Sequence, residues 1–131
     1  MQSQYPTSLY FAAGPNVGVE GQSSESSTRR TYNATLADDY DLFRRGVKAA
    51  LRAALLAMAL DGCDVTLLAG VSTGIYGGQH RERLRQEFEA LANEVLVEPM
   101  CHSVSGDGPR SLSECFARVI WTRLPAAQPG A

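Results

Sequence analysis

The chain contains the run Val65-Thr66-Leu67-Leu68-Ala69, followed at once by Gly70-Val71-Ser72-Thr73-Gly74-Ile75-Tyr76-Gly77-Gly78. The first run predicts a strand buried on both faces of a mostly parallel sheet. A charged stretch with helical periodicity, Arg81 to Leu96, comes next. Strand, glycine-rich turn and helix together predict an anion cradle. Glycines let backbone N–H groups and the positive end of a helix approach a phosphate closely.

Two helices with an apolar stripe stand out on either side of this strand. The first spans Asp38 to about Asp61, with three aspartates suited to its first turn and Gly62 suited to its end. Gly46 lies inside it and indicates close packing there. Its stripe is Leu42, Phe43, Val47, Ala50, Leu51, Ala54, Leu55 and Met58. The stripe of the second helix is Leu84, Phe88, Leu91 and Val95.

Two further segments predict strands, one at each end of the chain. Leu9 to Ala13 is short and apolar and ends at Gly14-Pro15. Cys115 to Thr122 offers Phe116, Val119 and Trp121 as core residues. The alternating order predicts an α/β fold, a layered mixed sheet flanked by helices. We expect one domain over residues 1–124 and a disordered tail over 125–131.

Composition narrows the classes of protein to which this chain can belong. Its 131 residues are 44% hydrophobic and 20% charged, as in an ordinary globular domain. The formal net charge of -2 gives no electrostatic case for binding nucleic acid or an anionic membrane. No apolar run has the length of a membrane span, and Met1 to Pro6 is too polar for a signal peptide.

The cysteines indicate a reducing setting. Cys63, Cys101 and Cys115 are odd in number and share no metal-type spacing. We expect free thiols in an intracellular, cytoplasmic protein, with no metal and no cofactor. The adjacent pair Cys101-His102 has no further ligands beside it, so it does not predict a metal site.

Three stretches between Ser8 and Leu96 carry a resemblance to a known family. They are a strand ending in Gly14-Pro15, a long amphipathic helix, and the loop Ser72-Thr73-Gly74-Ile75-Tyr76-Gly77. In order and spacing they resemble the C-terminal half of a macro domain, the ADP-ribose-binding module. The resemblance implies a partial macro-domain-like fold that binds ADP-ribose or a related nucleoside diphosphate. The associated chemistry would be removal of ADP-ribose from protein.

The resemblance places the ligand on the glycine-rich loop. Backbone amides from Ser72 to Tyr76 would hold the two phosphates, and the Tyr76 ring would pack against a ribose. The ligand-binding residues are then Gly70, Val71, Ser72, Thr73, Gly74, Ile75, Tyr76 and Gly77. The family's first half, with its adenine-recognising acid and second glycine-rich loop, has no counterpart here, so no catalytic residue is identified. A second copy or a partner chain would cover the exposed sheet edge.

Two other functions remain open at this point. The chain could be a structural or interaction domain that keeps the fold without the ligand. It also contains Gly70-Val71-Ser72-Thr73-Gly74, formally the nucleophile elbow of a serine hydrolase. In that hypothesis Ser72 is the nucleophile. Its partners would come from the residues His80, His102, Glu87, Glu98 and Asp107.

Three arginines open the second predicted helix. Cations in a first turn oppose the helix dipole unless an anion lies nearby, which would suit a phosphate ligand. Arg83 and Arg85 are better explained as a solvated face paired with glutamates, while Arg81 fits either explanation.

Overall fold

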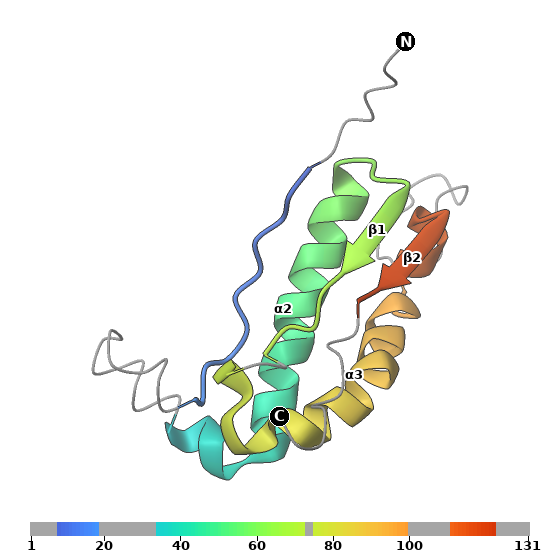
Figure 1. The fold of residues 1–131 in the computed structure, drawn as a ribbon. Helices are drawn as coiled ribbons and strands as arrows, with labels where there is room; N and C mark the ends of the chain where they lie inside the picture. Colours follow the sequence, from blue (N-terminus) through green and yellow to red (C-terminus); the bar gives the residue numbers. More distant parts are fainter. Residues whose placement is uncertain (1–7, 19–33, 73–74, 100–110, 123–131) are drawn as a thin grey trace, which may run out of the picture.

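The computed structural model describes residues 8–18, 34–72, 75–99 and 111–122 (Figure 1). Within these ranges the chain combines helices with a small parallel sheet, so it belongs broadly to the α/β class. A short helical stretch, residues 34–38, precedes the main elements. These are helix α2 (Tyr40–Leu60), strand β1 (Val65–Leu68), 3₁₀-helix η1 (Ile75–His80), helix α3 (Arg81–Leu96), 3₁₀-helix η2 (Leu112–Cys115) and strand β2 (Arg118–Trp121).

Strands β1 and β2 pair in parallel, with α3 in the connection between them. The register sets Thr66 beside Val119 and Leu68 beside Trp121. Thr66 and Leu68 are buried, and α2 and α3 lie on this one side of the sheet (Figure 1). The predicted last strand is confirmed as β2, shorter than expected, with Phe116 buried just before it.

The expectation that Val65 to Ala69 is buried on both faces is wrong. Strand β1 ends at Leu68, and its side chains alternate between exposed and buried. Val65 is 53% exposed and Leu67 is 61% exposed, because the helices of the described ranges cover the other face only. An apolar run shows that both faces can be buried, but it does not supply the elements that bury them.

The predicted strand Leu9 to Ala13 does not form. Residues 8–18 are extended, but the structure assigns them no strand. In Figure 1 they run in the same direction as β1, and α2 lies between the two in this view. The Tyr10 hydroxyl lies 3.3 Å from the Cys63 sulfur, just before β1, and the Pro15 carbonyl accepts a hydrogen bond from Ser72, just after it. Both contacts use side chains and involve residues before and after β1, and the structure gives no backbone ladder between this segment and the strand.

Helix α2 begins two residues later than predicted, since Asp38 belongs to the preceding helical stretch, and it ends one residue before the predicted limit. Asp39 is the N-cap residue, and its carboxylate accepts a hydrogen bond from the Leu42 backbone N–H at 3.2 Å. Gly62, just past the end, adopts a φ of 77°, which favours glycine. The expected close packing at Gly46 is confirmed, since a Cβ there would lie 2.5 Å from the Pro15 ring. The buried side chains are Tyr40, Phe43, Val47, Leu51 and Leu55; Leu42 is partly exposed, contrary to expectation.

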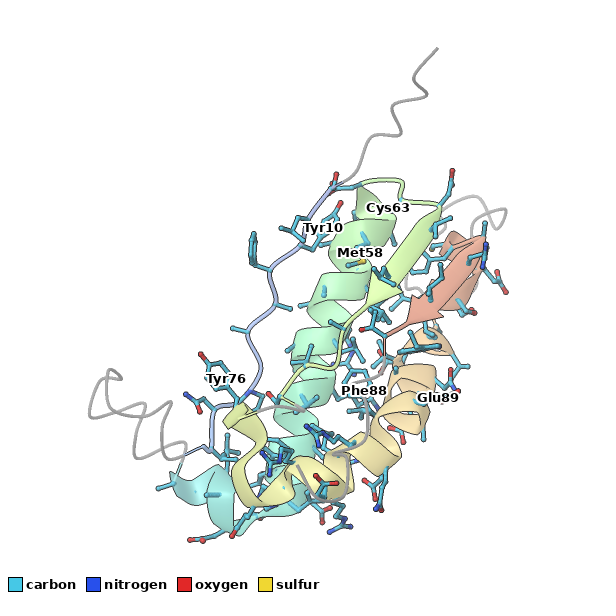
Figure 2. All side chains as sticks on the ribbon, in the orientation of Figure 1. Tyr10, Met58, Cys63, Tyr76, Phe88 and Glu89 are labelled. Carbon is cyan, nitrogen blue, oxygen red and sulfur yellow. The ribbon has the colours of Figure 1, made fainter. Side chains whose placement is uncertain are left out.

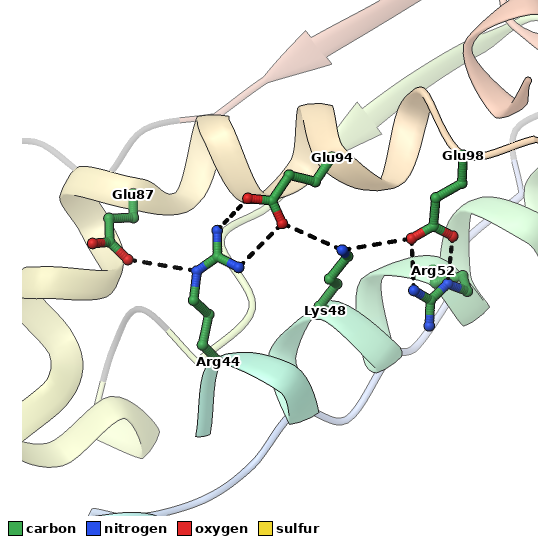
Figure 3. A network of polar contacts seen from close by, with 6 residues as sticks. All are labelled: Arg44, Lys48, Arg52, Glu87, Glu94 and Glu98. Atoms are coloured by element: carbon green, nitrogen blue, oxygen red, sulfur yellow. Dashed lines mark hydrogen bonds and ion pairs between the residues drawn. The ribbon is translucent and has the colours of Figure 1, made fainter. Parts of the chain in front are cut away.

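Helix α3 has the predicted bounds, and its predicted stripe is buried. A ladder of ion pairs joins α3, together with Glu98 just past its end, to α2 (Figure 3). The guanidinium of Arg44 lies 2.6 Å from the Glu94 carboxylate, and that of Arg52 lies 2.6 Å from the Glu98 carboxylate. The Lys48 ammonium lies between these two glutamates and pairs with both. The side-chain hydrogen bonds from these arginines lower the pKa values of the Glu94 and Glu98 carboxyls. Since residue numbers rise together along both helices, α2 and α3 run parallel.

We expect the backbone amides of Thr66 and Leu68 to exchange with solvent slowly, and those of Val65 and Leu67 rapidly. The carbonyls of Asp64 and Leu68 accept hydrogen bonds from the β2 side. Backbone groups alternate in direction along a strand, so Val65 and Leu67 direct theirs away from β2. Hydrogen exchange followed by NMR measures this directly. Equal protection of all four amides would mean that a further strand pairs with β1.

Candidate functional site

The candidate site is the glycine-rich loop that leaves the carboxyl end of β1 and enters α3 through η1. The structure describes Gly70 to Ser72 and the backbone from Ile75 onward. Thr73 and Gly74, two of the predicted ligand-binding residues, lie outside the described residues. In open α/β sheets, ligands bind outside the carboxyl ends of the strands, which is where this loop lies.

Ser72 is the conformationally unusual residue of the loop. Its φ is 58°, in the left-handed region that non-glycine residues rarely adopt. The side chain is buried, and its hydroxyl donates a hydrogen bond to the Pro15 carbonyl at 2.8 Å. That bond helps to hold the loop in a conformation that costs free energy, and unusual backbone of this kind is concentrated at functional sites.

Two glycines let the chain approach itself closely around this residue. A Cβ on Gly77 would overlap the Ser72 carbonyl oxygen. Gly78 has a φ of 51°, and a Cβ there would lie 2.7 Å from the Val17 carbonyl oxygen. The Val17 N–H in turn donates to the Tyr76 carbonyl at 2.8 Å. Residues 14–17 and the loop therefore form one tightly packed unit.

Among the described side chains of this unit, Tyr76 is a large one that faces solvent. It is 48% exposed and lies next to the segment 8–18 (Figure 2). Its backbone is fixed by the bond to Val17, so the ring projects from a defined point. A ring so placed could pack against the face of a sugar or a base.

His80 is buried away from Ser72, in an aromatic cluster with α2. Its Nε2 atom lies 2.9 Å from the Leu36 carbonyl oxygen. Its ring centroid is 4.9 Å from that of Phe43 and 5.3 Å from that of Tyr40. The hydroxyl of Ser72 and the imidazole of His80 thus have separate backbone partners, and the structure does not bring the two side chains together.

The acids named in the hydrolase hypothesis are also engaged elsewhere. Glu87 accepts a hydrogen bond from the Tyr40 hydroxyl at 2.5 Å, and this bond lowers its pKa. Burial, followed by the same bond, raises the pKa of Tyr40 to about 12. Glu98 belongs to the α2–α3 ladder. His102 and Asp107 lie outside the described residues, as does the pair Cys101-His102.

The three arginines at the start of α3 differ in their surroundings. Arg83 stacks over the Tyr40 ring at 3.8 Å and pairs with Glu87 at 3.5 Å, and Arg85 pairs with Glu82 at 3.0 Å. The interpretation of these two as a paired helix face is confirmed. Arg81 has a more distant contact with Glu82, at 3.9 Å, and directly follows the loop and η1.

Sequence reasoning missed the contribution of residues 15–17 to the site. The sequence predicts Gly14-Pro15 only as the end of a strand, whereas in the structure Gly14 lets the chain pass directly against Val71 and Ser72. Asn16 is buried, and its side-chain oxygen accepts a hydrogen bond from the Gly18 N–H at 3.2 Å. The available signal in the sequence was an asparagine directly after a Gly-Pro pair, a combination typical of turns.

The expected free thiols are confirmed for Cys63 and Cys115, while Cys101 lies outside the described residues. In the part of the chain that the structure describes, no group of three or more histidines, cysteines and acids could hold a metal ion. Over the same ranges, no helix combines the length and the apolar character needed to cross a bilayer.

No protein-family model matches this chain. No curated protein and no solved structure is significantly similar to it either. The geometry of the loop and its surroundings is therefore the basis for the functional argument that follows.

Proposed function

We propose that this chain is a partial macro-domain-like module that binds ADP-ribose or a related nucleoside diphosphate on the loop after β1. The observation that carries the proposal is the fixed backbone around Ser72, with a positive φ and a tether to Pro15. A phosphate cradle depends on N–H groups that are already oriented before the ligand arrives. Glycines at 77 and 78 allow the close turn that such a cradle requires.

Tyr76 supports the diphosphate assignment over that of a simple anion site. Its exposed ring stands beside the loop and would contact the ribose attached to the phosphates. Arg81, directly after the loop, would add a positive charge near the second phosphate. Both contacts are absent for inorganic phosphate, so the complete ligand should bind more tightly than its fragments.

We expect binding to be weak and release of ADP-ribose from protein to be undetectable with this chain alone. A cradle without an opposing wall stays open to water, and each hydrogen bond then contributes only about 0.5–1.5 kcal/mol. A calorimetric titration with ADP-ribose, ADP and pyrophosphate measures the first expectation. A release assay on mono-ADP-ribosylated protein measures the second, and clear turnover would contradict it.

Two variants locate the ligand. Tyr76→Ala should weaken ADP-ribose binding about tenfold, a loss of about 1.4 kcal/mol, whereas Tyr76→Phe keeps the ring and should bind as the parent does. Gly74→Val should reduce binding further, because a β-branched side chain blocks close backbone approach to a phosphate. Unchanged affinity in both Tyr76→Ala and Gly74→Val would show that the ligand lies elsewhere.

An interaction domain without a ligand is the second candidate, favoured by the exposed apolar face of the sheet. An interaction domain would bind none of ADP-ribose, ADP and pyrophosphate.

The serine hydrolase hypothesis predicts labelling of Ser72 by a serine-reactive phosphonate. We expect no labelling, because the hydroxyl is buried and donates to a backbone carbonyl.

A further inference from the structure

Asn16 is a buried polar side chain between the two contacts that join residues 15–17 to the ligand loop. It is 3% exposed, and its side-chain oxygen accepts a hydrogen bond from the Gly18 N–H at 3.2 Å. An asparagine that binds its own backbone two residues on sets the course of the chain over that turn. Burying an amide is unfavourable unless its polar atoms are paired, so this bond makes an asparagine tolerable inside the packed unit.

The chain before Asn16 is fixed without the help of its side chain. The Pro15 carbonyl accepts the hydrogen bond from Ser72 at 2.8 Å. The Pro15 ring packs against Gly46 of α2, where an added Cβ would lie 2.5 Å from it. These two contacts support the proposed phosphate cradle around Ser72, so that part of the site does not depend on the Asn16 side chain.

The chain after Asn16 carries the contact to Tyr76. The Val17 N–H donates to the Tyr76 carbonyl at 2.8 Å, and the Val17 side chain is buried in the core. Val17 lies between Asn16 and Gly18, the two residues that the side-chain bond joins. The direction of the Val17 N–H therefore depends on this bond.

The contact from Val17 matters because Tyr76 lies on a short and irregular helix. The 3₁₀-helix η1 has six residues and is kinked at Gly78, whose φ of 51° and ψ of -129° are not helical. Hydrogen bonds within a 3₁₀-helix have poorer geometry than those within an α-helix. A bond from outside the helix therefore contributes more to holding the Tyr76 backbone, and with it the exposed ring (Figure 2).

We propose that Asn16 is a positioning residue of the ligand site. Its bond to the Gly18 N–H fixes the turn over residues 16–18, and this turn holds the Tyr76 ring where the ribose of the ligand would meet it. The inference rests on the proposed function, since a fixed ring matters only if a ligand packs against it. Asn16 is itself buried, so it acts through Tyr76 and not on the ligand. A ring that is ordered before binding loses less entropy when the ligand arrives.

Calorimetric titration of variants with ADP-ribose and with pyrophosphate tests the proposal. Asn16→Ala should weaken ADP-ribose binding by up to about tenfold, the loss expected for Tyr76→Ala, and should leave pyrophosphate binding as in the parent. Asn16→Asp keeps a side-chain oxygen that can accept the Gly18 N–H and should restore most of the affinity. The matched control is Gln79→Ala, which removes an exposed amide bonded to the Ala37 carbonyl and should bind as the parent does.

A double-mutant cycle separates positioning from a general effect on stability. In a Tyr76→Ala background, Asn16→Ala should cause no further loss of ADP-ribose affinity, because both changes act through one ring. An equal loss in both backgrounds would overturn the proposal. Full affinity of Asn16→Ala for ADP-ribose would also overturn it while leaving the proposed function intact. A parent chain that binds no ADP-ribose would overturn the proposed function and, with it, this inference.

Hydrogen exchange of the parent protein without ligand provides a measurement that needs no variant. The amides of Val17 and Gly18 should both exchange slowly, since both residues are buried and both N–H groups donate hydrogen bonds. Rapid exchange of the Gly18 amide would show that its bond to Asn16 is not formed. That result would overturn the proposal even if Asn16→Ala fails to fold.

Discussion

Replacing Phe43 by alanine is expected to lower the free energy of unfolding by about 3–5 kcal/mol, the usual cost of removing a buried aromatic ring. Phe43 is buried in α2, and its ring lies 4.9 Å from the His80 ring at the entry to α3. Truncation leaves a cavity where α2 meets η1. Because small domains have only about 5–15 kcal/mol in total, this one change removes a large share of the stability.

Urea unfolding followed by circular dichroism measures the loss. The matched control is Leu42→Ala, one residue earlier on the same helix but partly exposed, for which we expect less than about 1 kcal/mol. If Phe43→Ala does not fold, Phe43→Leu keeps most of the volume and should cost about 1 kcal/mol. Equal losses for Phe43→Ala and Leu42→Ala would contradict the position of the core.

The helices were the part of the fold that could be predicted best. The bounds and buried stripe of α3 follow from its periodicity, and Asp39 and Gly62 mark the limits of α2 through local chemistry. Such signals are contained within a few turns of chain. Leu42 was misassigned because it borders the stripe, where a small rotation of the helix decides between burial and exposure.

The sheet was harder to predict because strands depend on partners distant in sequence. Leu9 to Ala13 has strand-forming residues and an extended backbone, yet no ladder forms, since propensity does not provide a partner. The run at Val65 to Ala69 identified a strand correctly but not its exposed face. A hydrophobic side chain can be buried without loss of hydrogen bonds, but whether it is buried depends on which elements of the fold lie over it.

The candidate site was partly predictable for the same reason. Strand, glycine-rich turn and helix are local, so the position of the loop at the end of β1 follows from the sequence. The hydrogen bond from Ser72 to the Pro15 carbonyl joins residues that are far apart along the chain, and no local sequence pattern predicts it. His80 also shows the difference: as a candidate catalytic base it depended on a tertiary contact, and its ring instead packs on α2.

Placing a methyl group on Gly77 is expected to open the loop and lower the free energy of unfolding by about 1–3 kcal/mol, the range for forcing extra volume into a packed site. The added Cβ would overlap the Ser72 carbonyl oxygen and lie 3.1 Å from the Arg81 Cβ. A backbone oxygen cannot turn aside as a flexible side chain does. Relief requires Ser72 to move, which breaks its bond to Pro15 and frees residues 14–17.

Gly62→Ala is the matched control for Gly77→Ala. It introduces backbone strain without a steric clash, whereas Gly77→Ala introduces a clash with a neighbouring backbone atom. Gly62 has a φ of 77° with no neighbouring atom within 4 Å of an added Cβ, so alanine there pays only about 1–2 kcal/mol of backbone strain. Hydrogen exchange should rise in residues 8–18 and 70–80 for Gly77→Ala, and only near the end of α2 for Gly62→Ala. If Gly77→Ala leaves exchange in residues 8–18 unchanged, the loop and residues 14–17 are not one packed unit, and the preformed cradle loses its support.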